Sequence, residues 1–428
     1  MAKESPEQFQ PPTADSPQAA IPTFSISDHS RPYEALSKYL TFENLDHHEW
    51  WRHGAPMLSK MLSDANYDIH HQFQHLCLFG LHIVPLLGPF PAARSGPYRC
   101  LLGGFGSLEF SENFTGSEAT IRIGFEPTAH TAGASSDPAN RLIINEALSR
   151  LKKVDPQMDL RLYHQLVNEL AINDQEETLL RDRDELEKQP SKSQTILALD
   201  LKGGAFTAKL YLFPILKSAA TGRSLPHLVS NAIRKVDERG AFKDSLAMIE
   251  DYLQTTPATT SICYLSCDLV DPEKTRLKIY IEEDQVMFGR VSDIWTMGGK
   301  LTDKETMTGL QMLRELWTAL EIIEGVRMPV DRATILGDGP DILPLLFNFE
   351  TRPFQKDPKL KIYIPLVGVN DMEIARVLSE FFAKYGMSEH ADSYTRNWMS
   401  YWYVFRSEEN IYKVYVTETF YSQATSGP

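Results

Sequence analysis

The sequence predicts an α+β fold in which ten antiparallel strands close into a central barrel with a ring of outer helices. Three observations lead to this prediction. Pairs of strands joined by turns recur five times, and helical segments separate the pairs. The second strand of each pair alternates an apolar face with a face that carries a cation. A sheet of ten strands tends to close, because closure removes its exposed edges.

The chain is expected to hold one folded domain behind a disordered tail. Residues 1–28 are rich in Pro, Ser and Gln and poor in large apolar side chains, which predicts a disordered N-terminal tail. The remaining residues, 29–428, are predicted to form a single barrel domain. With 428 residues and 42% hydrophobic side chains, the chain can bury a large core.

Each element follows from the period of its apolar residues. Alternation of period two predicts strands over 99–111, 119–127, 194–201, 206–214, 261–270, 275–283, 343–353, 359–366, 397–406 and 411–421. Helical spacing predicts helices over 33–63, 69–87, 140–151, 157–172, 223–237, 243–253, 284–296, 303–324 and 371–386. The segment "TDKE" at 302–305 reads as a capping box that opens the helix over 303–324.

Charge and cysteine usage exclude several classes of partner. A net charge of −14 argues against sequence-independent electrostatic binding to nucleic acid or to an anionic membrane. No run of 18 apolar residues predicts a transmembrane helix. The four cysteines show no CxxC spacing and lie among apolar residues, which favours reduced thiols and a cytoplasmic protein. His71 and His75 lack a third zinc ligand at a suitable spacing, so no metal site is predicted.

The cations on the second strands usually stand two residues from a tyrosine. They are Arg122, Lys209 with Tyr211, Arg276 and Lys278 with Tyr280, Lys361 with Tyr363, and Lys413 with Tyr415. If helices cover the outside of the barrel, the apolar faces point outward and the Lys/Tyr faces line the lumen. The alternative is a set of exposed lysines on a sheet with one face in solvent. Recurrence in five hairpins favours one shared site.

Converging cations predict an anionic ligand. Buried charges of one sign repel one another and lose hydration unless something neutralises them, and a diphosphate meets that need. Tyrosine rings beside it can shield a carbocation with their negative faces. The pattern therefore predicts ionisation of an allylic diphosphate under aromatic cover.

Glu109 lies on the polar face of its strand with Ser107 and Ser111. A carboxylate in an aromatic chamber can accept the N–H of an indole and stabilise the charge that develops as the ring attacks a cation. A salt bridge to a neighbouring lumen cation is an equally good interpretation of the spacing.

Several sequence blocks resemble the fungal indole prenyltransferases of the dimethylallyltryptophan synthase family. They include "LEFSENF", "IRIGFEP", "LSCDLVDPEKTRLKIYI" and "KLKIYIPL", and the similarity covers about residues 33–421. The resemblance implies an αββα prenyltransferase barrel. It also implies an enzyme that uses dimethylallyl diphosphate as co-substrate, without a metal or other cofactor. The sequence agrees in lacking a DDxxD motif.

The resemblance assigns roles to individual residues. Glu109 matches the glutamate that binds the indole N–H, and Leu101 and Leu102 join it in the acceptor pocket. The matches to the diphosphate-binding positions are Arg122, Lys209, Arg276, Lys278 and Lys361. The matches to the tyrosine shield are Tyr211, Tyr280, Tyr363 and Tyr415, with Trp398 where a further shield tyrosine is common.

These sequence blocks are most similar to the branch that acts on tryptophan-containing cyclic dipeptides and related indole alkaloids. Cys263 stands near the position where enzymes for free tryptophan carry an arginine, which favours an acceptor without a free carboxylate. Free tryptophan, tyrosine or another phenol is the alternative acceptor. A non-catalytic carrier of an anionic aromatic ligand is the alternative outside catalysis.

The predicted partners are small molecules, namely the prenyl diphosphate and the indole acceptor. A monomer and a homodimer both fit the sequence. For the group that takes the final ring proton, Glu109, Lys192 and Gln194 remain candidates.

Overall fold

A computed structural model describes residues 31–90, 98, 100–102, 106–189, 191–326, 344–366 and 370–405. The predicted tail over 1–28 and the predicted strand over 411–421 lie outside the described residues, and Tyr415 lies outside them as well.

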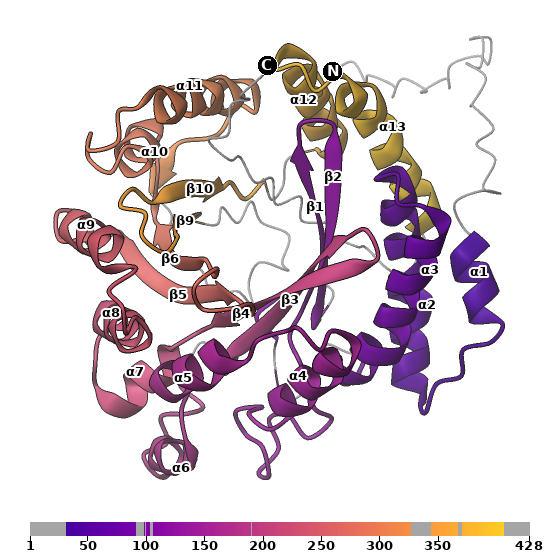
Figure 1. Cartoon of the computed structure of the whole chain (residues 1–428), viewed down its shortest axis with the longest axis horizontal. Coiled ribbons are helices and arrows are strands. Elements are labelled where there is room, and N and C mark those ends of the chain that lie inside the picture. Colours follow the sequence, from indigo (N-terminus) through magenta and orange to yellow (C-terminus); the bar gives the residue numbers. More distant parts are fainter. Residues whose placement is uncertain are drawn as a thin grey trace, which may run out of the picture.

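Eight strands form one antiparallel sheet that curls around a central space (Figure 1). Each strand pairs with its neighbours in the order β1 (Leu108–Thr115), β2 (Glu118–Phe125), β3 (Thr195–Lys202), β4 (Ala205–Leu212), β5 (Thr260–Asp268), β6 (Leu277–Glu283), β9 (Leu345–Thr351) and β10 (Lys359–Tyr363). A separate two-stranded sheet pairs β7 (Gln285–Val286) with β8 (Gly325–Val326). The first four predicted hairpins are confirmed, although the strand predicted over 99–111 begins only at Leu108 and runs on to Thr115.

The fifth predicted hairpin is wrong in its first strand. Residues 397–405 belong to the helix α13 (Ser388–Phe405), so the ten-stranded closed barrel is not observed in the described residues. The aromatic residues at positions 398, 402 and 405 are spaced by four and three, which suits a helix as well as an alternating strand. No Gly or Pro interrupts the segment after position 388. The helical period therefore prevailed.

Helices cover the outer side of the curled sheet (Figure 1). They are α1 (Arg31–Ser37), α2 (Leu45–Asp64), α3 (Ile69–Leu78), α4 (Ile143–Val154), α5 (Arg161–Leu170), α6 (Asp174–Asp182), α7 (Ile215–Thr221), α8 (Leu225–Val236), α9 (Lys243–Leu253), α10 (Phe288–Trp295), α11 (Lys304–Ala319), α12 (Asp371–Lys384) and α13. Within the described part of the chain, none of them has the length and apolarity needed to cross a membrane.

The start of α11 differs slightly from the prediction. Asp303 rather than Thr302 is the N-cap, and its side chain accepts a hydrogen bond from the Thr306 N–H. An aspartate cap satisfies one of the free N–H groups of the first turn as well as a threonine cap does, so the helix begins one residue later.

The main core lies between the outer face of the sheet and these helices. Ile121, Ile123 and Phe125 of β2 alternate into it, and Leu197, Leu199 and Leu210 follow on β3 and β4. Because side chains alternate along a strand, the other face of each of these strands is turned to the central space. That face carries the predicted cations, as the apolar pattern indicates.

Candidate active site

The sheet register brings four of the predicted cations onto one face. Arg122 stands opposite Asp200, and Lys209 stands opposite Asp268. Lys278 and Lys361 continue the same face on β6 and β10. Lys209, Lys278 and Lys361 are nearly inaccessible, at 2%, 4% and 2% exposure. Separate hairpins therefore contribute buried cations to one region.

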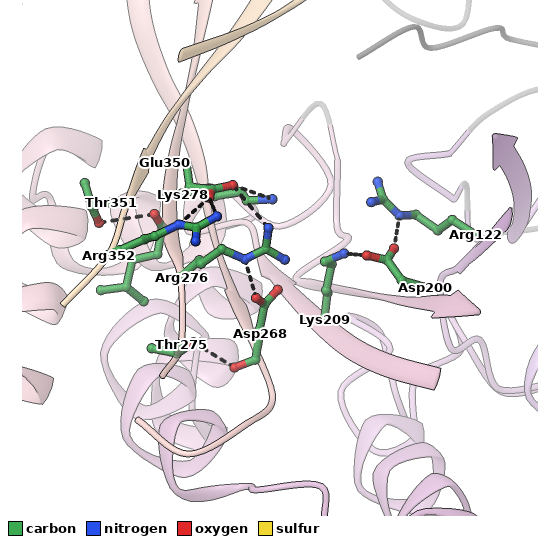
Figure 2. A network of polar contacts seen from close by, with 11 residues as sticks. Arg122, Asp200, Lys209, Asp268, Thr275, Arg276, Lys278, Glu350, Thr351 and Arg352 are labelled. Carbon is green, nitrogen blue, oxygen red and sulfur yellow. Dashed lines mark hydrogen bonds and ion pairs between the residues drawn. The ribbon is translucent and has the colours of Figure 1, made fainter. Parts of the chain in front are cut away.

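Arg276 joins this group from the residue before β6. Figure 2 shows its guanidinium directed toward Asp268 and Glu350, on the side of the network where Lys278 lies. The charges of Lys278, Arg122 and Arg276 all act on Lys361, which places the fifth cation within electrostatic reach of the others.

Three carboxylates that the sequence analysis did not select bind these cations. Asp200 bridges two of them, with Oδ1 2.5 Å from the Arg122 Nε and its other oxygen bonded to the Lys209 Nζ. Asp268 accepts from the Arg276 Nε at 2.6 Å. Glu350 lies 3.4 Å from both Arg276 and Lys278, as Figure 2 shows.

These carboxylates correct one prediction. A polyanionic ligand is not required to neutralise the whole cluster, because Asp200, Asp268 and Glu350 already balance three of the five predicted cations. All three acids lie on the first strands of their hairpins, in phase with the polar face. The prediction drew on second strands alone. When all eight groups are ionised, two positive charges remain in excess, and Arg352, which binds Glu350 at 3.0 Å, adds a third.

Burial and mutual repulsion lower the pKa values of the three lysines. Burial lowers the pKa of Lys278 to about 8. It also lowers the pKa values of Lys209 and Lys361, and neighbouring cations act in the same direction. Burial opposes ionisation of Glu350, yet the charges of Lys278, Arg276 and Arg352 bring its pKa down to about 2. An added anion would therefore stabilise the protonated lysines.

Three of the predicted shield tyrosines lie together beside the cations. The ring centroids of Tyr211 and Tyr280 are 6.1 Å apart, and those of Tyr280 and Tyr363 are also 6.1 Å apart. The Asn348 side chain donates to the Tyr363 hydroxyl at 3.1 Å. Tyr264, which the sequence analysis did not select, stacks on Tyr280 at 4.1 Å. It too lies on a first strand.

The remaining shield residues are not placed by the structure. Trp398 belongs to α13, but its side chain is outside the description, and Tyr415 lies beyond the described residues.

Glu109 lies beside two small residues of the sheet. Gly124 stands opposite it on β2, and Ala198 follows on β3, so these two strand positions leave room beside the carboxylate. Glu109 forms no hydrogen bond or ion pair with the described residues, and the salt-bridge interpretation is not supported there. Burial raises its pKa, and the charge of Arg122 acts in the opposite direction. The Glu109 charge contributes to raised pKa values for Tyr211 and Tyr363, which places it near the shield.

Two candidates for the final proton acceptor are engaged elsewhere. Lys192 forms an ion pair with Glu187 at 2.6 Å, and the Gln194 side-chain oxygen accepts from the Ile172 N–H at 2.8 Å. Cys263 sits at a β-bulge between Ile262 and Tyr264 and is partly exposed.

A cavity of about 860 Å³ reaches the cluster at Arg122, Asp200 and Arg276. From there it extends past the edge strand β1 to Tyr394 on α13. Of the predicted site residues, Arg122 and Arg276 line it, whereas Glu109 and the tyrosines Tyr211, Tyr280 and Tyr363 are not among its lining residues. Its volume falls within the ~300–1,000 Å³ typical of small-molecule pockets.

Comparison with known proteins gives the family. Residues 46–397 match the family profile described as tryptophan dimethylallyltransferase. This chain belongs to the tryptophan dimethylallyltransferase family. The predicted resemblance is confirmed.

Curated relatives of this family member cover most of its length. Roquefortine prenyltransferase of Penicillium rubens is 44% identical over 86% of both chains. A tryptophan dimethylallyltransferase of Epichloe coenophiala is 36% identical over 86% of this chain and 84% of the relative.

Solved structures give the same fold. AnaPT from Neosartorya fischeri has a TM-score of 0.77 and 29% identity, covering 86% of this chain and 88% of its own. NotF, solved with brevianamide F and DMSPP, has a TM-score of 0.76 and 30% identity, covering 92% of this chain and 99% of its own.

Across the described ranges, no group of three or more His, Cys, Asp or Glu side chains is arranged to hold a metal ion in this dimethylallyltransferase. The acids of the cluster bind Lys and Arg instead.

Proposed function

We propose that this family member transfers a dimethylallyl group from dimethylallyl diphosphate to the indole ring of a tryptophan-containing cyclic dipeptide or a related indole. The observation that carries the proposal is the cluster of five cations, with two charges in excess, beside stacked tyrosine rings and an unbridged Glu109. A passive carrier has no need for cations next to a tyrosine enclosure.

The chemistry begins with the diphosphate. Arg122, Lys209 and Lys278, together with Arg276 and Lys361, hold its oxygens and stabilise the negative charge that develops on them. The allylic C–O bond breaks, and its electron pair stays with the diphosphate. The faces of the neighbouring tyrosine rings stabilise the allylic cation.

The acceptor then supplies the electrons for the new bond. The open space beside Gly124 and Ala198 admits a flat indole, whose N–H is donated to Glu109. Electron density from the ring forms a carbon–carbon bond to the allylic cation. When aromaticity returns, the ring proton passes to Glu109, since the other candidates Lys192 and Gln194 are engaged elsewhere.

We also propose roles for predicted features that the described residues do not test. The strand predicted over 411–421 would extend the sheet toward closure and bring Tyr415 to the shield. The chain from residue 29 onward would form one domain around this lumen. Leu101 and Leu102 would line the acceptor side.

The proposal of an acceptor without a free carboxylate rests on the charges near the acceptor side of the site. The cations of the described lumen gather at the carboxylate cluster, and Cys263 carries no positive charge at neutral pH because its thiol can ionise only to an anion. A free carboxylate on the acceptor would find no dedicated cation near Glu109 other than Arg122. The alternative acceptors are tryptophan, tyrosine and other phenols.

A product-resolved assay tests this function. The protein is incubated with dimethylallyl diphosphate and, in turn, brevianamide F, other tryptophan-containing cyclic dipeptides, tryptophan and tyrosine, and product masses are read. We expect a gain of one dimethylallyl group on a cyclic dipeptide and release of diphosphate. Binding of the diphosphate without any product would instead favour the carrier.

Two variants separate the assigned roles. Lys209→Ala should lower kcat/KM for the donor about thirtyfold or more, since truncating one partner of a buried ion pair is costly. Glu109→Gln should lower turnover about a hundredfold or more with donor affinity retained. Lys217→Ala is the matched control, because Lys217 is also a buried lysine paired with a carboxylate, Glu176, but lies on α7 outside the sheet. Full turnover in both Lys209→Ala and Glu109→Gln would defeat the assignment.

A further inference from the structure

We propose that Glu126 is a positioning residue that fixes the described residues of the segment 98–102, namely Tyr98 and residues 100–102, and through them the proposed acceptor residues Leu101 and Leu102. The inference rests on the proposed function, and it adds a residue that controls how the acceptor reaches Glu109. Its basis is a set of hydrogen bonds at the end of β2.

Glu126 continues the lumen face of β2. Gly124 stands opposite Glu109, and two residues later the Glu126 N–H donates to the Ser107 carbonyl at 2.9 Å, which extends the antiparallel pairing. Because alternate residues of a strand share a face, Glu126 lies on the same side of the sheet as Gly124. Its exposure is 0%, whereas Glu109 remains partly exposed.

Three groups donate hydrogen bonds to the Glu126 carboxylate. The Tyr98 hydroxyl donates to Oε1 at 2.5 Å, and the Ser193 hydroxyl donates to the same oxygen at 2.6 Å. The Leu101 N–H donates to Oε2 at 2.7 Å. Two of the three donors come from the segment 98–102, and the third comes from the residues that lead into β3.

A buried carboxylate held only by neutral donors is costly. Among the described residues no cation forms an ion pair with Glu126, in contrast to Asp200, Asp268 and Glu350. Burial raises the pKa of Glu126, and its three hydrogen bonds oppose that shift. Charge-assisted hydrogen bonds are short and directional, so this carboxylate fixes the segment in one place.

The position of this segment bears on the acceptor. Leu101 and Leu102 stay partly exposed while Tyr98 is anchored at its hydroxyl. Glu126 also pairs through its own N–H with the carbonyl of Ser107, two residues before Glu109, so movement at this carboxylate is transmitted to the start of β1. Of the donor cluster, Arg122 shares β2 with Glu126, but its guanidinium binds Asp200, and Lys209, Lys278 and Lys361 lie on β4, β6 and β10. A loosened segment should therefore disturb acceptor placement and leave the diphosphate end unchanged.

The variants Tyr98→Phe, Ser193→Ala and Glu126→Gln test the inference in the full-length protein. Each removes or misdirects one hydrogen bond of the carboxylate. We expect KM for the acceptor to rise about tenfold in Tyr98→Phe and in Glu126→Gln. KM for dimethylallyl diphosphate should stay within about twofold, and the ratio of product isomers should change, since it depends on how the indole is placed.

Tyr163→Phe is the matched control. Tyr163 is another buried tyrosine whose hydroxyl donates to a side chain, that of Asn145, but it lies on α5 outside the sheet. Its variant should keep both KM values and the product ratio. If Glu126→Gln fails to fold, Tyr98→Phe and Ser193→Ala carry the test.

Unchanged acceptor KM and product ratio in the folded variants would overturn the inference. An equal rise in both KM values would also overturn it, because a general loss of structure acts on both substrates. A failure of the unsubstituted protein to prenylate any indole would remove the proposed function itself and the inference with it.

Discussion

Individual charged side chains in the lumen are held by charged neighbours from other hairpins. Asp200 touches both Arg122 and Lys209, so one carboxylate holds two cations that approach from different hairpins. This arrangement lets Arg122 and Lys209 approach each other in a buried space before any substrate is bound, because both contact the same carboxylate. A bound diphosphate then competes with the carboxylates for the same N–H groups.

Lys278 predicts a pH dependence for donor binding. Burial lowers its pKa to about 8, against an ordinary value of 10.5, and a bound diphosphate favours the protonated lysine. Donor affinity should therefore be complete below pH 8 and fall as the pH rises through about 8, by about tenfold at pH 9 relative to pH 7. Calorimetric titration with an unreactive thiolodiphosphate measures it.

The variant Lys278→Arg is the control for this titration, because arginine keeps its charge throughout the range. Its donor affinity should change less between pH 7 and pH 9. Equal affinity of the unsubstituted protein at the two pH values would show that Lys278 does not bind the diphosphate.

Each of the second, third and fourth hairpins carries an acid on its first strand and a cation on its second. The pairs are Asp200 with Lys209, Asp268 with Lys278, and Glu350 with Lys361. The register also sets Lys209 opposite Asp268, so the charges link neighbouring hairpins. The repeated unit is an acid–cation hairpin.

Much of this unit was predictable, because period-two alternation assigns each residue to a face whatever its partners. The cations and tyrosines of β4, β6 and β10 were found in that way. Asp200 and Glu350 were accessible to the same reasoning, had it been applied to the first strands. The register between strands could not be predicted in this way, since it depends on which strands pair.

The aromatic segment that ends α13 shows where local pattern fails. Trp398 and the residues after it suit a strand by composition and a helix by spacing, and only tertiary packing decides between them. Glu126 was missed for a related reason. Its partners Tyr98 and Ser193 are 28 and 67 residues away in the sequence.

Phe114 tests the packing of α12 and α13 on the edge strand β1. Its ring lies 5.2 Å from Phe382, 4.7 Å from His390 and 5.7 Å from Tyr394. Phe114→Ala should lower the free energy of unfolding by about 2 kcal/mol, less than a fully buried phenylalanine would, because Phe114 is only partly buried. Denaturant titration measures the loss.

Tyr39→Ala serves as the control, since Tyr39 is an aromatic residue with 83% exposure. It should change the free energy of unfolding by less than about 0.5 kcal/mol. Equal effects of Phe114→Ala and Tyr39→Ala would contradict the packing of these helices on β1.

The whole molecule is acidic, yet one cluster in its lumen carries more cations than carboxylates. A net charge of −14 repels an anionic substrate at long range, but salt limits that repulsion to about 8 Å at physiological ionic strength. Inside the sheet the nearest charges decide, and there cations exceed carboxylates by two among the eight groups of the cluster. The fold therefore binds an anion by local geometry, with hairpins far apart in sequence supplying the charges.

A crystal structure with dimethylallyl thiolodiphosphate and an indole acceptor tests this claim most directly. We expect the diphosphate oxygens to lie within hydrogen-bond distance of Arg122, Lys209, Arg276, Lys278 and Lys361, with the allyl chain against Tyr211, Tyr280 and Tyr363 and the indole N–H at Glu109. A diphosphate bound away from these cations, with their ion pairs to Asp200, Asp268 and Glu350 unchanged, would contradict it.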